Sequence, residues 1–310
     1  MKQNIKYINV LVLIMVAFMW FSCEDQETTY EYKAIPKTET GALLVNGTDL
    51  IAQIKSDISY MVTAGVTATE IAYLSMKGLA MKAFVFEIDL TNPNINIEVS
   101  TPNNKPAFAM QPMTEQASYE DAEGHKVWGG INGDFFNTTN GAPQGIVYKD
   151  GEGIKTTFTD AVCTYFAITS DKKALIAGQD EYPELKSLFK EALGGRVWLV
   201  ERGALSIQTD DRVEPRTCIG VSKDGKRVWM LAVDGRNFWY SNGMQYVELG
   251  KCMIALGAYN AINLDGGGST TFFVRNTPDF VDGRFEIRNW PYDGGGKERA
   301  VANGLLLIGN

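Results

Sequence analysis

A carboxylate followed by three glycines and several hydroxyl residues is the part of the sequence best suited to chemistry. It lies within residues 261–274, between two segments rich in β-forming residues, so it predicts a strand, a tight turn and a second strand. Glycines let a ligand approach the backbone, and successive N–H groups in such a turn can bind an anion. These groups suit a reaction on an anionic or sugar substrate. The alternative is a plain hairpin whose aspartate only stabilises its own turn. The polar part reads Asp265, Gly266, Gly267, Gly268, Ser269 and Thr270.

This turn differs from a nucleotide-binding loop. A phosphate-binding loop of that kind has a lysine directly after its last glycine, and Ser269 stands there instead. Dinucleotide binding requires a helix after the glycines, and no helical pattern follows.

Four further polar clusters stand beside apolar segments. Those at Asp134 and Asp234, like the cluster at Asp265, each follow an apolar strand, where a rigid scaffold can hold binding groups at the edge of a cleft. Each cluster has a simpler interpretation: a plain turn at Asp234, a surface arginine at Arg216, or a solvated charge pair at residues 298–299. The four clusters contain Asn132 and Asp134, Glu214 and Arg216, Asp234 and Arg236, and Glu298 and Arg299.

The clusters occur in the order found in the phosphodiester glycosidase family, which this chain resembles over about residues 126–308. The similarity rests on five ordered motifs, which makes a chance match improbable. One departure is Cys218, which stands where alanine is common and does not affect the site. The motifs read Asn132-Gly133-Asp134-Phe135-Phe136, Pro215-Arg216-Thr217-Cys218-Ile219-Gly220, Asp234-Gly235-Arg236, Asn263-Leu264-Asp265-Gly266-Gly267-Gly268-Ser269-Thr270 and Glu298-Arg299-Ala300-Val301-Ala302-Asn303.

The resemblance implies hydrolysis of a sugar-1-phosphodiester between the anomeric carbon and the phosphate oxygen. An oxocarbenium-like transition state needs one carboxylate near the anomeric carbon and a second group for the nucleophile or the leaving oxygen. A phosphate departs with little protonation, so an arginine that binds two of its oxygens can replace a strong acid. We therefore expect Asp265, Glu298 and Arg216 to be catalytic, with Arg216 holding the phosphate. The expected substrate-binding residues are Asn132, Asp134, Asp234, Arg236, Gly266, Gly267, Gly268, Ser269, Thr270 and Arg299.

Two other functions remain open. Exposed aromatic residues such as Trp239, Tyr240, Trp290 and Tyr292 would suit a noncatalytic glycan-binding lipoprotein. An enzyme that trims or transfers phosphate-linked glycan in envelope polymers would share the predicted site and differ in its acceptor. Carboxylates and arginines meeting in one cleft would favour an enzyme.

Composition excludes several classes of protein. The chain has 310 residues, 45% of them hydrophobic, so it can bury a sizeable core. A net charge of −8 argues against nonspecific nucleic-acid binding. A single histidine, His125, leaves little scope for His-based metal sites, and no zinc-type cysteine spacing or calcium loop is present. We expect no cofactor and leave a metal requirement open.

The N-terminus resembles a bacterial lipoprotein signal. Two lysines precede an apolar run from Ile8 to Phe21, which is shorter than a typical transmembrane helix. Cys23 follows, and the resemblance implies that it becomes the lipidated first residue of an exported, envelope-anchored protein, on either the periplasmic or the surface side. The membrane contact would be this lipid anchor. Three cysteines remain (Cys163, Cys218 and Cys252), which permit at most one disulfide.

The elements that must position the clusters are mostly hairpins. Patterns predict helices from Thr48 to Val62, over 113–119, over 185–192 and over 246–256, and a hairpin formed by 83–90 and 95–99. An apolar strand is expected from Arg299 to Ile308. Many hairpins and few helices indicate an α+β fold with mixed, mostly antiparallel sheets around one catalytic cleft. We expect a signal over 1–22, a tether over 23–40, a small region over 41–125 and a catalytic domain over 126–310.

Overall fold

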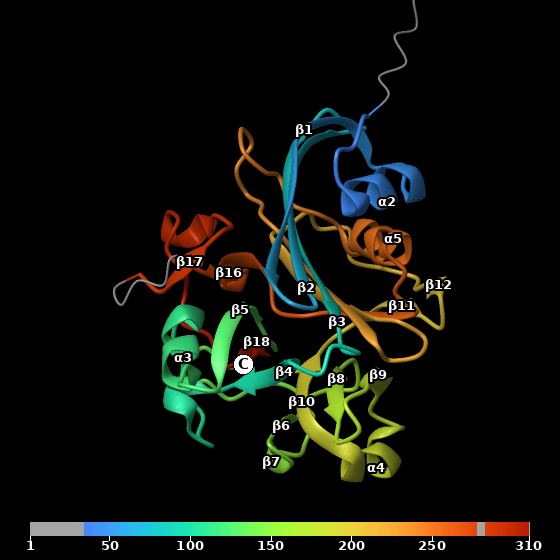
Figure 1. Cartoon of the computed structure of the whole chain (residues 1–310). Coiled ribbons are helices and arrows are strands. Elements are labelled where there is room, and N and C mark those ends of the chain that lie inside the picture. Colours follow the sequence, from blue (N-terminus) through green and yellow to red (C-terminus); the bar gives the residue numbers. More distant parts are fainter. Residues whose placement is uncertain (1–33, 278–282, 310) are drawn as a thin grey trace, which may run out of the picture. The chain divides into compact units, whose positions relative to one another are not determined.

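Antiparallel sheets make up most of the structure (Figure 1). The computed structural model describes residues 34–277 and 283–309, and Ala34–Asn310 form one compact unit. Every strand pair in these ranges is antiparallel, which confirms the predicted α+β class. The expected signal, Cys23 and most of the tether lie outside the described residues. No helix within the described ranges is long and apolar enough to span a membrane.

The largest sheet has eight strands, and its central strands are buried on both faces. In β14, alternate residues face two different hydrophobic cores, because successive side chains of a strand point to opposite sides. One core is shared with the two smaller sheets, and there the rings of Phe86 and Phe272 stack with centroids 3.9 Å apart. The strands, in sheet order, are β1 (Ile51–Thr63), β2 (Val66–Ser75), β3 (Ala80–Asp89), β14 (Arg227–Val233), β13 (Arg216–Val221), β15 (Asn260–Asn263), β11 (Trp198–Glu201) and β12 (Ala204–Leu205).

In the view of Figure 1, the five-stranded sheet that contains β6 and β10 lies below the large sheet, and the one that contains β5 and β18, together with β16 and β17, lies to its lower left. Two of the predicted site motifs lie at the ends of inner strands of the sheet that contains β5 and β18. One motif lies where β5 ends at Asn132, and the other lies just before β18, which follows Asn303. The strands of the other small sheet, in order, are β7 (Glu152–Lys155), β6 (Val147–Lys149), β10 (Phe189–Gly195), β8 (Thr164–Thr169) and β9 (Ala174–Gly178). Those of the sheet that contains β5 and β18 are β17 (Phe285–Ile287), β16 (Phe272–Arg275), β5 (Lys126–Asn132), β18 (Gly304–Gly309) and β4 (Ile95–Ser100).

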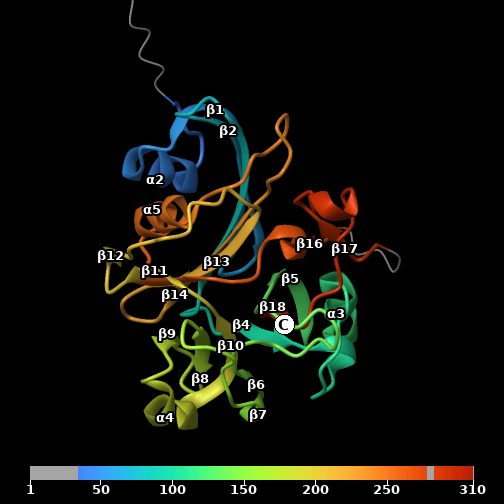
Figure 2. The same cartoon turned by 180° about the vertical axis from the view of Figure 1, so that it is seen from behind.

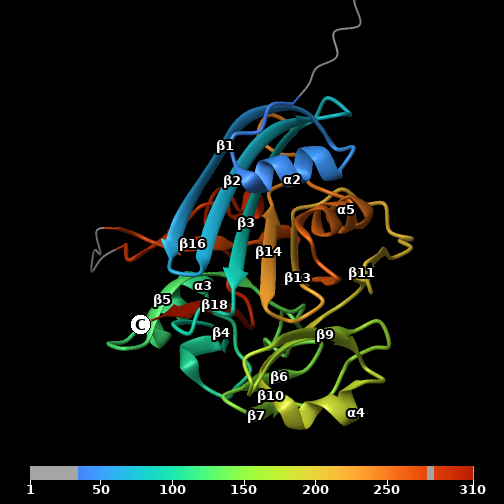
Figure 3. The same cartoon turned by 45° about the vertical axis from the view of Figure 1, so that its right-hand side comes forward.

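Helices α2 and α5 lie side by side on the outer face of the large sheet (Figure 3). Helix α5 begins with a capping box formed by Gln245 and Glu248, and it ends at Gly257, whose φ of 104° is readily adopted only by glycine. The helices are α2 (Glu39–Gly47), α3 (Met113–Glu120), α4 (Tyr182–Leu185) and α5 (Tyr246–Leu256), with single 3₁₀ turns η1 (Pro102–Asn104), η2 (Lys186–Leu188), η3 (Gly267–Ser269) and η4 (Tyr292–Gly294).

Two predicted helices are wrong. The segment predicted as a helix from Thr48 to Val62 forms β1, an edge strand whose apolar residues Ile58 and Met61 are 60% and 75% exposed. Its apolar spacing therefore does not mark a buried helical face. Residues 189–195 form β10, after short helical turns that end at Leu188. Helices α3 and α5 are confirmed.

The predicted hairpin of residues 83–99 is also wrong. Both strands form, but β3 pairs with β2 and β14, whereas β4 pairs with β18 in another sheet. The final strand begins at Gly304 rather than Arg299. Because β3 and β4 pair with strands beyond residue 126, the sheets cross the boundary expected between the small region and the catalytic domain.

Candidate active site

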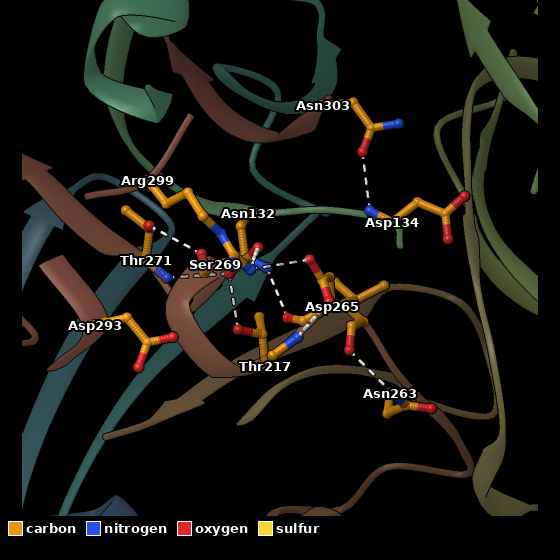
Figure 4. Close-up of polar contacts among 12 residues, drawn as sticks. Asn132, Asp134, Thr217, Asn263, Asp265, Ser269, Thr271, Asp293, Arg299 and Asn303 are labelled. Carbon is orange, nitrogen blue, oxygen red and sulfur yellow. Dashed lines mark hydrogen bonds and ion pairs between the residues drawn. The ribbon is translucent and has the colours of Figure 1, made fainter. Parts of the chain in front are cut away.

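The side chain of Asn132 joins three segments that are distant in the sequence (Figure 4). Its Oδ1 accepts hydrogen bonds from Thr217 Oγ1 at 2.7 Å and from the Thr271 backbone N–H at 3.0 Å. Its Nδ2 donates to the backbone carbonyl of Asp265 at 2.7 Å. Asn132 is fully buried, so these bonds compensate the cost of burying its amide. The amide therefore fixes the turn after β15 against β5 and β13.

The carboxylate of Asp265 lies next to a serine and an arginine. Its Oδ1 accepts from the Gly266 N–H at 3.0 Å, and its Oδ2 lies 4.0 Å from Arg299 Nη2. The same Nη2 donates to Ser269 Oγ at 2.5 Å. Burial raises the pKa of Asp265, while the Ser269 hydroxyl, the Arg299 charge and the Gly266 N–H act in the opposite direction. A carboxylate (Asp265), a hydroxyl group (Ser269) and a cation (Arg299) therefore lie together here.

The carboxyl group of Asp134 is buried nearby. Its Oδ2 accepts from the Gly145 N–H at 2.6 Å, and burial, supported by the charge of Asp265, raises its pKa to about 7. Asn303 Oδ1 accepts from the Asp134 N–H at 2.8 Å. Asp134 Oδ1, Asn303 Nδ2 and Thr270 Oγ1 are buried and have no hydrogen-bond partner among the described residues. Unpaired buried polar atoms are rare, so the unpaired atoms of Asp134 and Asn303, which are joined through the Asp134 N–H, favour a water or substrate group beside them.

Two glycines of the turn are required by close packing. A Cβ on Gly266 would lie 2.6 Å from the carbonyl oxygen of Pro215, and one on Gly268 would lie 2.5 Å from Asp293 Oδ2. Gly267 has a φ of 61°, a conformation in which a side chain is strained. The three glycines thus allow the turn to pack against neighbouring segments of the same chain.

Asp234 and Arg236 fix the loops around this turn. Asp234 Oδ1 accepts from Asn289 Nδ2 at 2.9 Å, and its Oδ2 accepts from the Trp290 N–H at 2.8 Å. Burial raises the pKa of Asp234, and these two bonds oppose the shift. Arg236 forms two ion pairs of 2.7 Å, one with the carboxylate of Glu214 and one with that of Asp293.

The structure does not bring Glu298 to Asp265. Both carboxylate oxygens of Glu298 accept from the Thr114 N–H at the start of α3, and the Thr114 hydroxyl also donates to one of them. Its neighbour Arg299 is the residue of this motif that reaches Ser269. The expected pairing of Glu298 with Asp265 therefore has no support in the geometry.

Arg216 also lies away from the carboxylates. Its guanidinium group is 3.9 Å from the ring centroid of Tyr246 and donates to the backbone carbonyls of Met244 and Arg212. The side chain of Thr217 reaches Asn132 instead, because neighbours on a strand point to opposite faces. These contacts place the Arg216 guanidinium against Tyr246, and Arg299 is the cation that lies beside Asp265.

The sequence analysis did not single out several residues that build the site. Thr217 and Asn303 stand within the quoted motifs, so the signal for them was present. The others carry no distinctive local pattern. They are Thr271, Asn289 and Asp293.

A groove of about 890 Å³ borders the cluster on the Asp134 side. Phe135 and Tyr246 line it, and so does Arg196, whose guanidinium donates to Gln144 at 2.9 Å and to Asp160 at 3.1 Å. Neither Asp265 nor Arg299 lines this groove. We place the chemistry at Asp265, where polar groups converge, because a volume alone does not identify a reactive group.

The remaining candidates for redox or metal chemistry are the cysteines and the histidine, and of these Cys163 lines the groove on the Asp134 side. Cys163, Cys218 and Cys252 are free and buried, and His125 contacts Glu98. Within residues 34–277 and 283–309, no three His, Cys, Asp or Glu side chains are placed to hold a metal ion.

The family of the chain follows from the match of its motif-bearing region. The sequence profile described as phosphodiester glycosidase matches residues 125–308, more than half of the chain. The chain belongs to the phosphodiester glycosidase family. All the residues of the Asp265 site described above lie within this match, which confirms the resemblance seen in the sequence.

Individual relatives agree with this assignment. The N-acetylglucosamine-1-phosphodiester alpha-N-acetylglucosaminidases of Bos taurus and Homo sapiens are each 28% identical over 167 residues, or 47% of this chain. The match spans 31% and 32% of those two proteins, so less than a third of each corresponds to this phosphodiester glycosidase.

Solved structures show the same fold. The catalytic domain of the zebrafish N-acetylglucosamine-1-phosphodiester alpha-N-acetylglucosaminidase, auto-inhibited by its pro-peptide, matches with a TM-score of 0.61 at 20% identity, covering 83% of this chain and 85% of that domain. A hypothetical protein from Synechocystis matches with a TM-score of 0.58 at 15% identity, covering 82% of this chain and 64% of that one.

Proposed function

We propose that the protein hydrolyses N-acetylglucosamine-1-phosphodiesters. Water adds to the anomeric carbon as the bond from this carbon to the phosphate oxygen breaks, giving the free sugar and a phosphate monoester. The observation that carries the proposal is the arrangement of Asp265, Ser269 and Arg299, with Asp134 buried nearby. A noncatalytic glycan binder does not need two carboxylates with raised pKa values beside a cation.

Each group has a role that its contacts support. Asp265 stabilises the positive charge that develops at the anomeric carbon. The side chain of Arg299 is 44% exposed, and within the described ranges it contacts only Ser269 and Asp265, so much of its guanidinium can bind the phosphate. Asp134, with a pKa of about 7, can exchange a proton near neutrality as the second carboxyl group.

The test compares substrates that differ in the leaving group. We expect turnover of methyl N-acetylglucosamine-1-phosphate, which is a phosphodiester, and much slower turnover of methyl α-N-acetylglucosaminide, whose alkoxide leaves poorly. Liberated N-acetylglucosamine is measured for both. Absence of turnover on the phosphodiester, or equal turnover on both compounds, would refute the proposal.

The location of the protein is a separate proposal. The Cys23 signal supports export and lipid anchoring in the cell envelope, where glycans of the envelope or of a host would supply the substrate. Cells expressing the full chain in radioactive palmitate should label the protein, and Cys23→Ala should abolish the label. Equal labelling of both proteins would contradict the anchor.

A further inference from the structure

A pocket of about 340 Å³ lies on the outer side of the large sheet, away from the candidate active site. It is formed by the end of β2, the start of β3 and the first turns of α5, and none of Asp134, Asp265 and Arg299 lines it. Figures 1 and 2 show α5 on one side of the large sheet and β16, which follows the turn at Asp265, on the other. Pockets of this size with apolar walls and few polar groups commonly bind small molecules.

The walls of this outer pocket are apolar and adaptable. Three methionines line it, together with Leu50 and Leu79. Met81 and Met244 are buried, whereas Met76 is 67% exposed. Because a methionine side chain is flexible and polarizable, these residues can fit their surfaces to an apolar ligand.

Tyr73 places one unpaired polar group in the wall of the outer pocket. It is 4% exposed, and its hydroxyl forms no hydrogen bond within residues 34–277 and 283–309. Burial raises the pKa of this hydroxyl well above its ordinary value, so it stays protonated at neutral pH. A buried hydroxyl group without a partner is rare in proteins. Tyr73 therefore favours a ligand that brings a hydrogen-bonding group into the pocket.

The other polar side chains around the outer pocket already have partners within the chain. Each lysine is paired with a carboxylate, so neither offers a free charge to a ligand. A charged ligand would gain no new ion pair here, and an uncharged one fits better. The pairs are Lys77 with Glu248 at 2.8 Å, Lys251 with Asp49 at 2.6 Å, Ser75 Oγ with the Leu79 N–H at 3.1 Å, and Gln245 Nε2 with the Asp211 carbonyl at 2.7 Å.

The volume limits the size of the ligand. An apolar cavity of about 150 Å³ holds one benzene ring, so the outer pocket has space for about two rings. A fatty acyl chain that entered with its methyl end would leave the Tyr73 hydroxyl unpaired, which is unfavourable. We propose that the outer pocket binds an uncharged two-ring molecule whose single hydroxyl group forms a hydrogen bond with Tyr73. This binding is separate from the proposed hydrolysis and does not depend on it.

The test compares 2-naphthol with 2-methylnaphthalene, which have nearly the same shape and differ in the hydroxyl group. Equilibrium dialysis against the full chain measures the dissociation constant of each compound. Both should bind wild type. The ratio of the two constants should favour 2-naphthol by about 3- to 10-fold more in wild type than in Tyr73→Phe, the effect of one hydrogen bond. Absence of binding to wild type, or the same ratio in both proteins, would overturn the proposal.

Val213→Trp tests where the compounds bind. Val213 lines the outer pocket and is 41% exposed, so an indole ring there should obstruct the pocket and weaken binding of both compounds by about 10-fold or more. Val162→Trp is the matched control, because Val162 is 47% exposed and lines the groove near Asp134 instead. It should bind both compounds as wild type does, and thermal unfolding verifies that each variant is folded. Unchanged binding in Val213→Trp, or weaker binding in Val162→Trp, would refute the outer pocket as the site.

Discussion

Replacing Asp134 by Asn should stabilise the protein at alkaline pH while impairing catalysis. Asp134 is 1% exposed, and its pKa rises from 3.8 to about 7 in the folded protein. A group with a raised pKa contributes stability that is fully present below the unfolded value and is lost as pH rises through the folded value. The difference between 3.8 and about 7 corresponds to about 4 kcal/mol. Asn cannot ionise, and its Oδ1 can still accept from the Gly145 N–H.

We therefore expect the free energy of unfolding of wild type to fall, relative to that of Asp134→Asn, as the pH rises. The difference between the two proteins should grow by up to about 4 kcal/mol from pH 4 to pH 8. Urea unfolding at pH 4, 5, 6, 7 and 8 measures this difference, and the exposed Glu123→Gln is the control for removing one negative charge. Turnover of the phosphodiester should fall by about 10²-fold or more, as for loss of an acid–base group. A stability difference that is independent of pH would show that Asp134 is not buried as a carboxyl group with a raised pKa.

Four further substitutions test individual roles. Asp265→Asn should leave thermal unfolding nearly unchanged but lower kcat by about 10²-fold or more, because it removes the charge that stabilises the transition state; a folded variant with over about a third of wild-type kcat would exclude Asp265 as the catalytic carboxylate. Arg299→Lys should reduce kcat/KM on phosphodiesters, whereas Arg216→Lys should mainly lower the free energy of unfolding, by about 1–3 kcal/mol; the reverse pattern would restore Arg216 as the phosphate clamp. Glu298→Gln should lower the melting temperature because it weakens the bonds at the start of α3, and a loss of turnover at unchanged stability would return Glu298 to the catalytic set.

The motifs quoted from the sequence contain the residues that meet at Asp265, but in two of them the structure places the neighbour of the expected catalytic residue there, Thr217 beside Arg216 and Arg299 beside Glu298. In a strand, adjacent side chains point in opposite directions, so only one of Arg216 and Thr217 on β13 can face the turn at Asp265. In the motif with Arg216 and Thr217, the arginine was expected to act because its charge makes it the more reactive residue. It is Thr217, however, that makes the contact with Asn132. Local sequence does not reveal which face of a strand is turned toward a site.

The same limitation explains the errors in the fold. Strands with buried apolar residues, such as β15 and β16 on either side of the glycine turn, were predicted correctly because their patterns match their burial. Strand β1 lies at an edge and is partly exposed, so its pattern imitates a helix. The pairing of β4 with β18 joins residues that are far apart in the sequence, and no local signal indicates it.

The framework around Asn132 contains an amide, a hydroxyl group and backbone groups, and none of these changes its protonation near neutral pH. Acid or base can therefore alter the charges of Asp134 and Asp265 without loosening the frame that carries them. A pH–rate profile of this protein should report the titration of those two carboxyl groups as a coupled pair. Asn132→Asp would make the frame itself ionisable, and the profile would then mix chemistry with distortion of the site.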